Sequence, residues 1–397
     1  MMTEVRLKTV TQQLVRKGFG GTRPTVNLEH VMAGAGKLDV EPLAITDAHD
    51  NLAFEPGDVL FSKLRPYLAK SLLVDRPMFG SPEFLAIHPE PDLDSRFLLY
   101  LTLSSGWLAW AEATSYGTKM PRTSWQDMSQ FRLRLPPIEE QWRIADFLDD
   151  QVALLDRAID LRARQQTLLQ ARQWANLLAD VEAAHPQQVA IRRLLTFLTD
   201  GPFGSAFTSS DYVAEGAFVV RLGNIGFAEF HAGDGVFIAE DMWLRFPRCH
   251  VRRGDLLIAG LGDTNNHPGR ACVAPELGLA LVKGKCFCAR VEDKMVSADY
   301  LALILSSPLG ADLLALETRG STRGMINLEI VKSLVVPLPE RIAQERIVRD
   351  AILLRSEMAN ACALIEGQSF RLAERKQALI TAAVTGQFDV TTARSVA

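Results

Sequence analysis

The chain has 397 residues, of which 48% are hydrophobic and 23% charged, and its formal net charge is −4. This composition excludes wholesale disorder, and no apolar stretch reaches the roughly 18 uncharged residues of a membrane span. The five cysteines include no C-x-x-C pair and Met1–Lys8 leads into no apolar run, so we expect a cytoplasmic protein without a secretory signal, disulfide framework or zinc knuckle.

Residues 1–137 are predicted to form a first, strand-rich domain. Short apolar runs broken by Gly, Pro and Asn, such as Val59–Phe61 and Phe84–Ile87, favour strands. Leu98–Ala111 has the length and periodicity of a helix that packs on those strands. Residues 138–184 contain no proline and are predicted to be one long spacer helix.

Residues 185–337 are predicted to form a second domain of the same kind. Its apolar runs include Leu256–Ile258 and Leu279–Val282, and Tyr300–Leu316 has the periodicity of a helix. Residues 338–390 are predicted to be a second long helix, which ends near Gly386, a residue suited to a left-handed cap. Residues 391–397 are expected to be a frayed tail.

The second half of the chain repeats the first. An offset of about 200 residues in a chain of this length indicates two tandem copies of one unit. The matching segments are Gly57–Phe61 with Gly254–Ile258, Leu98–Ser105 with Tyr300–Ser307, and Leu135–Gln141 with Val336–Glu340 and the following Gln344.

Each long helix carries a heptad seam of apolar residues. A helix of about 60 Å with a narrow seam needs a partner helix, and the obvious partner is its own repeat. We therefore predict an α+β fold in which two tandem α/β domains are separated by two long helices, paired as an antiparallel coiled coil with pseudo-twofold symmetry. The alternative is that each helix packs on its own domain. The seam residues are Leu148, Val152, Leu155, Ile159 and Leu169 in the first helix and Ile347, Ala351, Leu354, Met358, Ile365, Leu372 and Leu379 in the second.

No catalytic or nucleotide-binding motif is complete. Gly34–Leu38 is similar to a phosphate-binding loop but lacks its first glycine and its Ser/Thr, and there is no G-x-S-x-G, H-E-x-x-H or adenine-methyltransferase N/D-P-P-aromatic motif. We therefore expect a non-catalytic chain that holds no cofactor or metal of its own. An enzyme with an unfamiliar site, such as Asp263 with His267 or His231 with Asp234, remains an alternative.

Four polar loops, at matching places in the two domains, have the side-chain chemistry of DNA recognition. Arg, Lys and Asn read base edges, whereas Ser, Thr, Tyr and Lys hold phosphates. The predicted contacts are Lys63, Arg65, Tyr67 and Lys70 in the first loop, Tyr116, Lys119 and Arg122 in the second, Thr264, Asn265, Asn266, His267 and Arg270 in the third, and Arg319, Ser321, Thr322 and Arg323 in the fourth.

On these segments the chain resembles the specificity subunits of type I restriction–modification systems. The similarity is strongest in LPPIEEQWRIADFL at 135–148, at 336–347, and in LAERKQALITAAVTGQFDV at 372–390. GDVLFSKLRPYLAK at 57–70 and DGPFGS at 200–205 are similar to two kinds of target-recognition domain. The first domain departs from the pattern because it has no D-G-x-x-G-S counterpart at its start.

The resemblance implies a division of labour between this chain and its partners. Each domain would read one half of a split duplex DNA target, and the helix pair would set the distance between the halves. Two modification (methyltransferase) subunits would supply S-adenosylmethionine and the adenine chemistry, and ATP-dependent restriction subunits would join them. The alternatives are a target-recognition accessory protein of another defence system with a different effector, and a coiled-coil adaptor that does not bind DNA.

Overall fold

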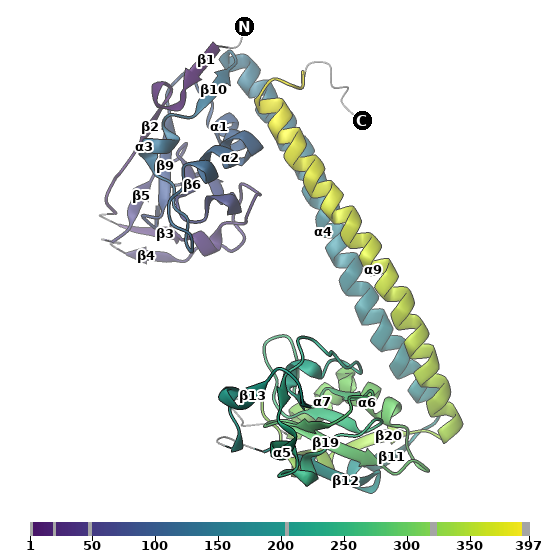
Figure 1. Cartoon of the computed structure of the whole chain (residues 1–397). Coiled ribbons are helices and arrows are strands. Elements are labelled where there is room, and N and C mark those ends of the chain that lie inside the picture. The colour runs from purple at the N-terminus through teal and green to yellow at the C-terminus, as the bar shows by residue number, and fades with distance from the viewer. Residues whose placement is uncertain (1–2, 19–20, 47–49, 203–205, 318–323, 391–397) are drawn as a thin grey trace. The chain divides into compact units, whose positions relative to one another are not determined.

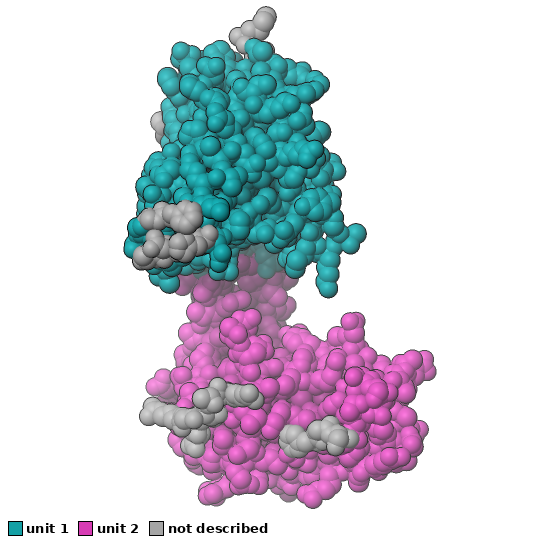
Figure 2. Space-filling model, turned by 90° about the vertical axis from the view of Figure 1, so that its left-hand side faces the viewer, with its two compact units in different colours: residues 1–164, 364–397 teal, residues 165–363 magenta. Residues whose placement is uncertain are grey.

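The computed structural model describes residues 3–18, 21–46, 50–202, 206–317 and 324–390 (Figure 1). The chain divides into two compact units, residues 1–164 with 364–397 (unit 1) and residues 165–363 (unit 2), which Figure 2 colours separately. The polypeptide passes from one unit to the other inside two long helices, α4 (Ile138–Ala183) and α9 (Arg341–Val384).

The α/β part of unit 1, here called the first module, consists of two four-stranded sheets and three short helices. One sheet is antiparallel, in the order β2-β9-β6-β7, and the other, β4-β3-β8-β5, contains the parallel pair β3–β8. A third, two-stranded ladder joins β1 to β10. The bounds are β1 Thr3–Arg6, β2 Thr11–Gln13, β3 Thr22–Val26, β4 Ala44–Thr46, β5 Leu52–Phe54, β6 Val59–Ser62, β7 Ser71–Leu73, β8 Met78–Gly80, β9 Phe84–Pro89, α1 Ser95–Leu103, α2 Ser105–Ala113, α3 Trp125–Met128 and β10 Arg132–Leu135.

The α/β part of unit 2, the second module, repeats this layout. Its antiparallel sheet has the order β12-β19-β16-β17, its mixed sheet β13-β15-β14-β18 contains the parallel pair β14–β18, and β11 pairs with β20. The bounds are β11 Gln187–Ala190, β12 Leu195–Asp200, β13 Tyr212–Val213, β14 Ala217–Val220, β15 Phe237–Ile238, α5 Glu240–Trp243, β16 Leu256–Ala259, β17 Ala271–Val273, β18 Ala280–Val282, β19 Cys286–Val291, α6 Ala298–Ser306, α7 Pro308–Glu317, α8 Leu328–Ser333 and β20 Val335–Leu338.

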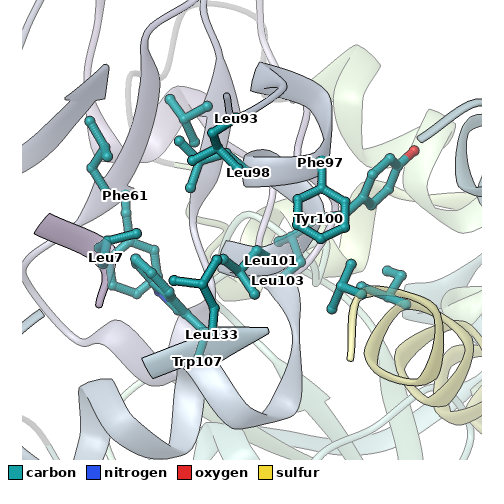
Figure 3. Packing of buried hydrophobic residues seen from close by; sticks show 14 of the residues in the cluster. Leu7, Phe61, Leu93, Phe97, Leu98, Tyr100, Leu101, Leu103, Trp107 and Leu133 are labelled. Atoms are coloured by element: carbon teal, nitrogen blue, oxygen red, sulfur yellow. The ribbon is translucent and has the colours of Figure 1, made fainter. Parts of the chain in front are cut away.

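The central strands β6 and β16 are buried along their whole length because both of their faces are covered. Successive side chains of a strand point to opposite faces of its sheet. In β6, Val59 and Phe61 therefore join the core formed with α1 and α2, whereas Leu60 joins the core between the two sheets. Figure 3 shows Phe61 and Trp107 of the first core, whose rings meet edge to face with centroids 5.5 Å apart. In the second module Ile258 of β16 lies in the corresponding core.

The two long helices pair within each unit. Ile144, Leu148 and Ile380 lie in the core of unit 1, and Leu177 and Ile347 lie in that of unit 2. One end of each helix therefore lies in the core of unit 1 and the other end in the core of unit 2. The boundary between the two compact units crosses α4 at 164–165 and α9 at 363–364. The helix ends thus pack on their modules, and the two helices also pair with each other. The predicted fold class, two α/β domains with a coiled coil, is confirmed.

The burial of the seam residues varies along the helices. Among those predicted, Leu148, Val152, Ile347 and Ile365 are buried, and Leu155, Ile159, Leu169, Ala351, Leu354, Met358, Leu372 and Leu379 are half-buried.

A buried glutamine near the start of each long helix anchors it to its module. Gln141 accepts a hydrogen bond from the Asp94 backbone N–H (2.8 Å) and donates to the carbonyls of residues 92 and 136. Gln344 accepts from the Ser297 N–H (2.9 Å) and donates to the carbonyls of residues 295 and 339. Because both side chains are fully buried, these repeated contacts fix each helix start to the turn before α1 or α6.

Among the helices that the structure describes, no single one is long and apolar enough to cross a membrane. The consecutive pair α6 and α7, bent by 70°, passes that test by length and composition only. Most of α6 lies in the core of unit 2.

Candidate nucleic-acid interface

The structure brings together the two predicted loops of the first module. The loop after β6 and the loop after α2 are joined by a bridge between Leu64 and Arg122. The Arg65 N–H donates to the Pro121 carbonyl (2.8 Å), and the Thr123 N–H donates to the Lys63 carbonyl (3.0 Å). Residues 56 to 60 positions apart in sequence are thus paired as in an antiparallel ladder and form one surface.

This surface exposes cations and aromatic rings. Tyr67 is 50% exposed, Tyr116 is 63% exposed, and Arg65 and Lys119 are also exposed. Arg122 is exposed but forms an ion pair with Glu83 (2.9 Å), which leaves its guanidinium partly neutralised. Cations hold phosphates and tyrosines offer both a ring face and a hydroxyl, so the surface has the chemistry of a DNA contact.

Lys70 has a different role from the one its sequence predicts. It is half-buried, and its ammonium donates to the Leu28 carbonyl (2.5 Å) in the 3₁₀ turn Leu28–His30. The side chain therefore points into the module rather than toward a ligand.

The second module repeats this arrangement. Leu261, after β16, is bridged to Met325, and the Gly262 N–H donates to the Gly324 carbonyl (3.1 Å). The predicted contacts Arg319, Ser321, Thr322 and Arg323 lie outside the described residues. The third loop is thus placed beside the chain that follows the fourth.

The tip of the third loop is closed by Asp263. Its carboxylate accepts hydrogen bonds from the backbone N–H groups of Asn265 (2.9 Å) and Asn266 (3.0 Å) and from the Asn266 side chain. These hydrogen bonds hold the pKa of Asp263 below its ordinary value, and the bond from the Asn265 N–H has the largest effect. Thr264 and Asn265 keep their side chains exposed at the tip, whereas the amide of Asn266 is engaged within the loop.

The proposed pairing of Asp263 with His267 is not observed. The imidazole of His267 contacts the carbonyls of Pro268 (2.8 Å) and Ser306 (3.4 Å) instead. Within the described ranges there is no group of three His, Cys, Asp or Glu side chains that could hold a metal ion.

The prediction that Arg270 contacts DNA is wrong. The residue is 4% exposed, and its guanidinium donates to the carbonyls of Ile225 (2.8 Å) and Leu222 (3.1 Å) as well as to two carbonyls in its own loop. Burial lowers the pKa of Arg270 from its ordinary value. The same position in the first module is Lys70, which also donates to a 3₁₀ turn, so both modules use a cation as an internal brace.

The buried cysteines are poor nucleophiles. Burial raises the pKa of the Cys272 and Cys286 thiols to about 12. A thiol is reactive as its thiolate, so neither side chain is activated at neutral pH.

Comparisons with known proteins agree with this geometry. Residues 41–169 match the family model described as the type I restriction modification DNA specificity domain. The EcoDI specificity subunit of Escherichia coli is 27% identical over 129 residues, which cover 32% of this chain and 29% of that protein. Residues 41–169 thus resemble a type I restriction–modification DNA specificity domain.

Two further similarities cover larger shares of the chain. The MjaVIII specificity subunit of Methanocaldococcus jannaschii is 21% identical over 178 residues, which cover 42% of this chain and 41% of that protein. The matched parts thus span less than half of either curated relative. A chain in a solved structure, described as the basis of complex assembly and conformational transition of the type I R-M system, has a TM-score of 0.73 and 20% identity over 98% of both chains, which shows the shared fold.

Sequence reasoning missed one basic cluster in this chain. Arg248, Arg252 and Arg253 are exposed within six residues, and no acidic side chain among the described residues forms an ion pair with them. Charge summed over whole domains hid the cluster, whereas a window of about ten residues would have found it.

Proposed function

We propose that this chain is a specificity subunit that recognises a split sequence in duplex DNA, with each module reading one half. The observation that supports this most strongly is the repeated bridge from the loop after β6 or β16 to a second segment, which is the polar loop after α2 in the first module and residues 324–325 in the second. Loops held on a rigid sheet are a common way to present binding residues. Phosphate contacts from the exposed cations would supply affinity, and a few base-edge contacts would supply sequence choice.

We further propose that the chain is non-catalytic and that partner subunits supply the chemistry. S-adenosylmethionine would bind the modification subunits, which would flip the target adenine out of the duplex, and ATP would bind the restriction subunits. Apolar side chains on α4 support the docking of such partners. Leu154, Leu161 and Leu168 are 60%, 55% and 68% exposed, and their spacing of seven puts them on one face of the helix. An exposed apolar face of this kind favours the binding of a helix from a partner subunit.

Mapping of N6-methyladenine in the source genome, with and without this gene, tests the proposal. We expect methylation to disappear at one two-part motif with a fixed gap when the gene is deleted, and to return when the wild-type gene is restored. Unchanged methylation in the deletion strain, with the methyltransferase expressed, would contradict the proposal and favour an accessory protein of another defence system.

A pair of matched variants locates the DNA surface. K63A/K119A removes two cations of the loop surface, and we expect it to restore little or no methylation. K8A/R134A removes two exposed cations near the β1–β10 ladder and should restore methylation fully. Equal behaviour of the two double variants would show that the loop surface does not contact DNA.

A further inference from the structure

Arg65 has an unusual backbone conformation. Its φ of 48° and ψ of 60° lie in the left-handed region, and Ala69, four residues on, has a φ of 49°. L-residues other than Asn, Asp and Gly rarely adopt this region because Cβ approaches the following carbonyl. An arginine is therefore an unfavourable choice here unless its side chain is required.

Hydrogen bonds on both sides hold this conformation. The Arg65 N–H donates to the Pro121 carbonyl (2.8 Å), and the Arg65 carbonyl accepts from the Leu68 N–H (2.9 Å). The Ser62 hydroxyl donates to the Leu64 carbonyl (2.6 Å), and Pro66 restricts the backbone that follows. The direction in which Cβ leaves the backbone is thus fixed before any ligand binds.

The Arg65 side chain makes no polar contact that would stabilise the described part of the fold. It is exposed, and its guanidinium has no hydrogen-bond or ion-pair partner among the described residues. A glycine would satisfy the backbone at less strain, so neither stability nor loop geometry explains the arginine. Strained residues of this kind gather at binding sites.

The second module has glycines at both matching positions. Gly262 follows the bridged Leu261 as Arg65 follows the bridged Leu64, but its φ is not positive, whereas Gly269, with a φ of 83°, matches the left-handed Ala69. A Cβ on Gly262 would meet the Asn266 carbonyl oxygen at 2.7 Å, so that loop is closed to a side chain. The first module therefore presents an arginine side chain where the second presents none, as expected of readers of different half-sites.

We propose that Arg65 is a specificity-determining residue that reads a guanine of the half-site bound by the first module. This rests on the proposed function. A phosphate can be contacted by a cation from many directions, so flexible lysines such as Lys63 and Lys119 are sufficient for that role. A bidentate contact with the O6 and N7 atoms of guanine needs the planar fork of a guanidinium, and the backbone of Arg65 fixes the direction in which the side chain that carries this fork leaves the loop.

Methylation mapping of strains that carry R65G, R65K or A69G at the chromosomal gene tests the assignment. For R65G we expect methylation to spread to sites that differ at one G·C pair of one half-site, with discrimination at that pair reduced about tenfold to a hundredfold. R65K should lose most of the same discrimination although it keeps the charge. A69G relieves the same kind of strain without removing a surface cation and should leave the target unchanged.

Two further measurements separate the outcomes. The purified R65G chain should melt at a temperature no lower than wild type, because glycine adopts a positive φ freely, so that misfolding does not explain its loss of specificity. Binding to the mapped duplex that weakens equally for every base substitution, with a salt slope reduced by about one, would identify a phosphate contact and overturn the base-reading role. An unchanged target would overturn it as well. Failure of the proposed function would appear earlier, as unchanged methylation on deletion of the gene.

Discussion

Lys70 and Arg270 occupy the same place in the two modules, and both donate to backbone carbonyls of a 3₁₀ turn. Those turns, Leu28–His30 and Leu222–Asn224, follow the parallel strands β3 and β14 of the mixed sheets. A carbonyl buried without a donor is unfavourable, and a cation can satisfy several carbonyls at once. The two side chains therefore link the loop that presents the candidate contacts to the other sheet of the module.

We expect R270M to destabilise unit 2 without acting on DNA directly. The change removes four hydrogen bonds of a 4% exposed guanidinium and leaves carbonyls unsatisfied. The free energy of unfolding, measured with urea, should fall by about 3 kcal/mol. K70M should lose only about 1 kcal/mol, because Lys70 makes one such bond and is half-exposed. Wild-type stability combined with lost DNA binding in R270M would show that the arginine does face the ligand.

These two residues also show what sequence can predict about a site. The loops, their matching positions and their polar chemistry were predictable because they depend on local composition and on the repeat. The direction of a side chain was not, because Lys70 and Arg65 lie five positions apart in one basic loop and only the tertiary contacts turn one inward and the other outward. The left-handed backbone of Arg65 has no sequence signal, since that conformation normally indicates glycine.

At the level of elements, the heptad seam and the helix starts were predictable, whereas the strand pairing was not. Strands of three to five residues, such as β3 and β8, carry too little pattern to specify a parallel partner about 50 positions away. The division of each long helix between two units was equally hidden. It arises because the helix ends lie in the module cores, as Ile144 and Leu177 of α4 do.

The buried glutamines give a test of how the helices are anchored. Q141A and Q344A each remove three hydrogen bonds to backbone groups, so we expect each to lose about 1–3 kcal/mol of local stability. Amide hydrogen exchange should quicken at 92–95 in Q141A and at 295–298 in Q344A. Q170A and Q368A change exposed glutamines of the same helices and should exchange like wild type. Exchange that does not quicken in either anchor variant would show that apolar packing alone holds the helix starts.

At the scale of the whole molecule, the two units combine one architecture with different contact chemistries. The first module presents cations and tyrosines on its joined loops, whereas the described tip of the third loop presents Thr264 and Asn265 beside the carboxylate of Asp263. Local clusters such as Arg248–Arg253 coexist with a net charge of −4. If the loops read DNA as proposed, the chain would supply sequence specificity but little of the overall positive potential that gives DNA-binding proteins their affinity.

This charge balance predicts weak binding by the isolated chain. With the duplex identified by methylation mapping, fluorescence anisotropy at physiological salt should give a Kd of about 1 µM or weaker, because few phosphates are neutralised. Addition of the proposed modification subunits should tighten binding and steepen its salt dependence, since they would supply the missing phosphate contacts. The salt slope of the isolated chain is the control, because it counts the phosphates that this chain contacts alone. Nanomolar binding without partners would contradict the prediction and mean that the local basic clusters, with base contacts such as that of Arg65, suffice for affinity.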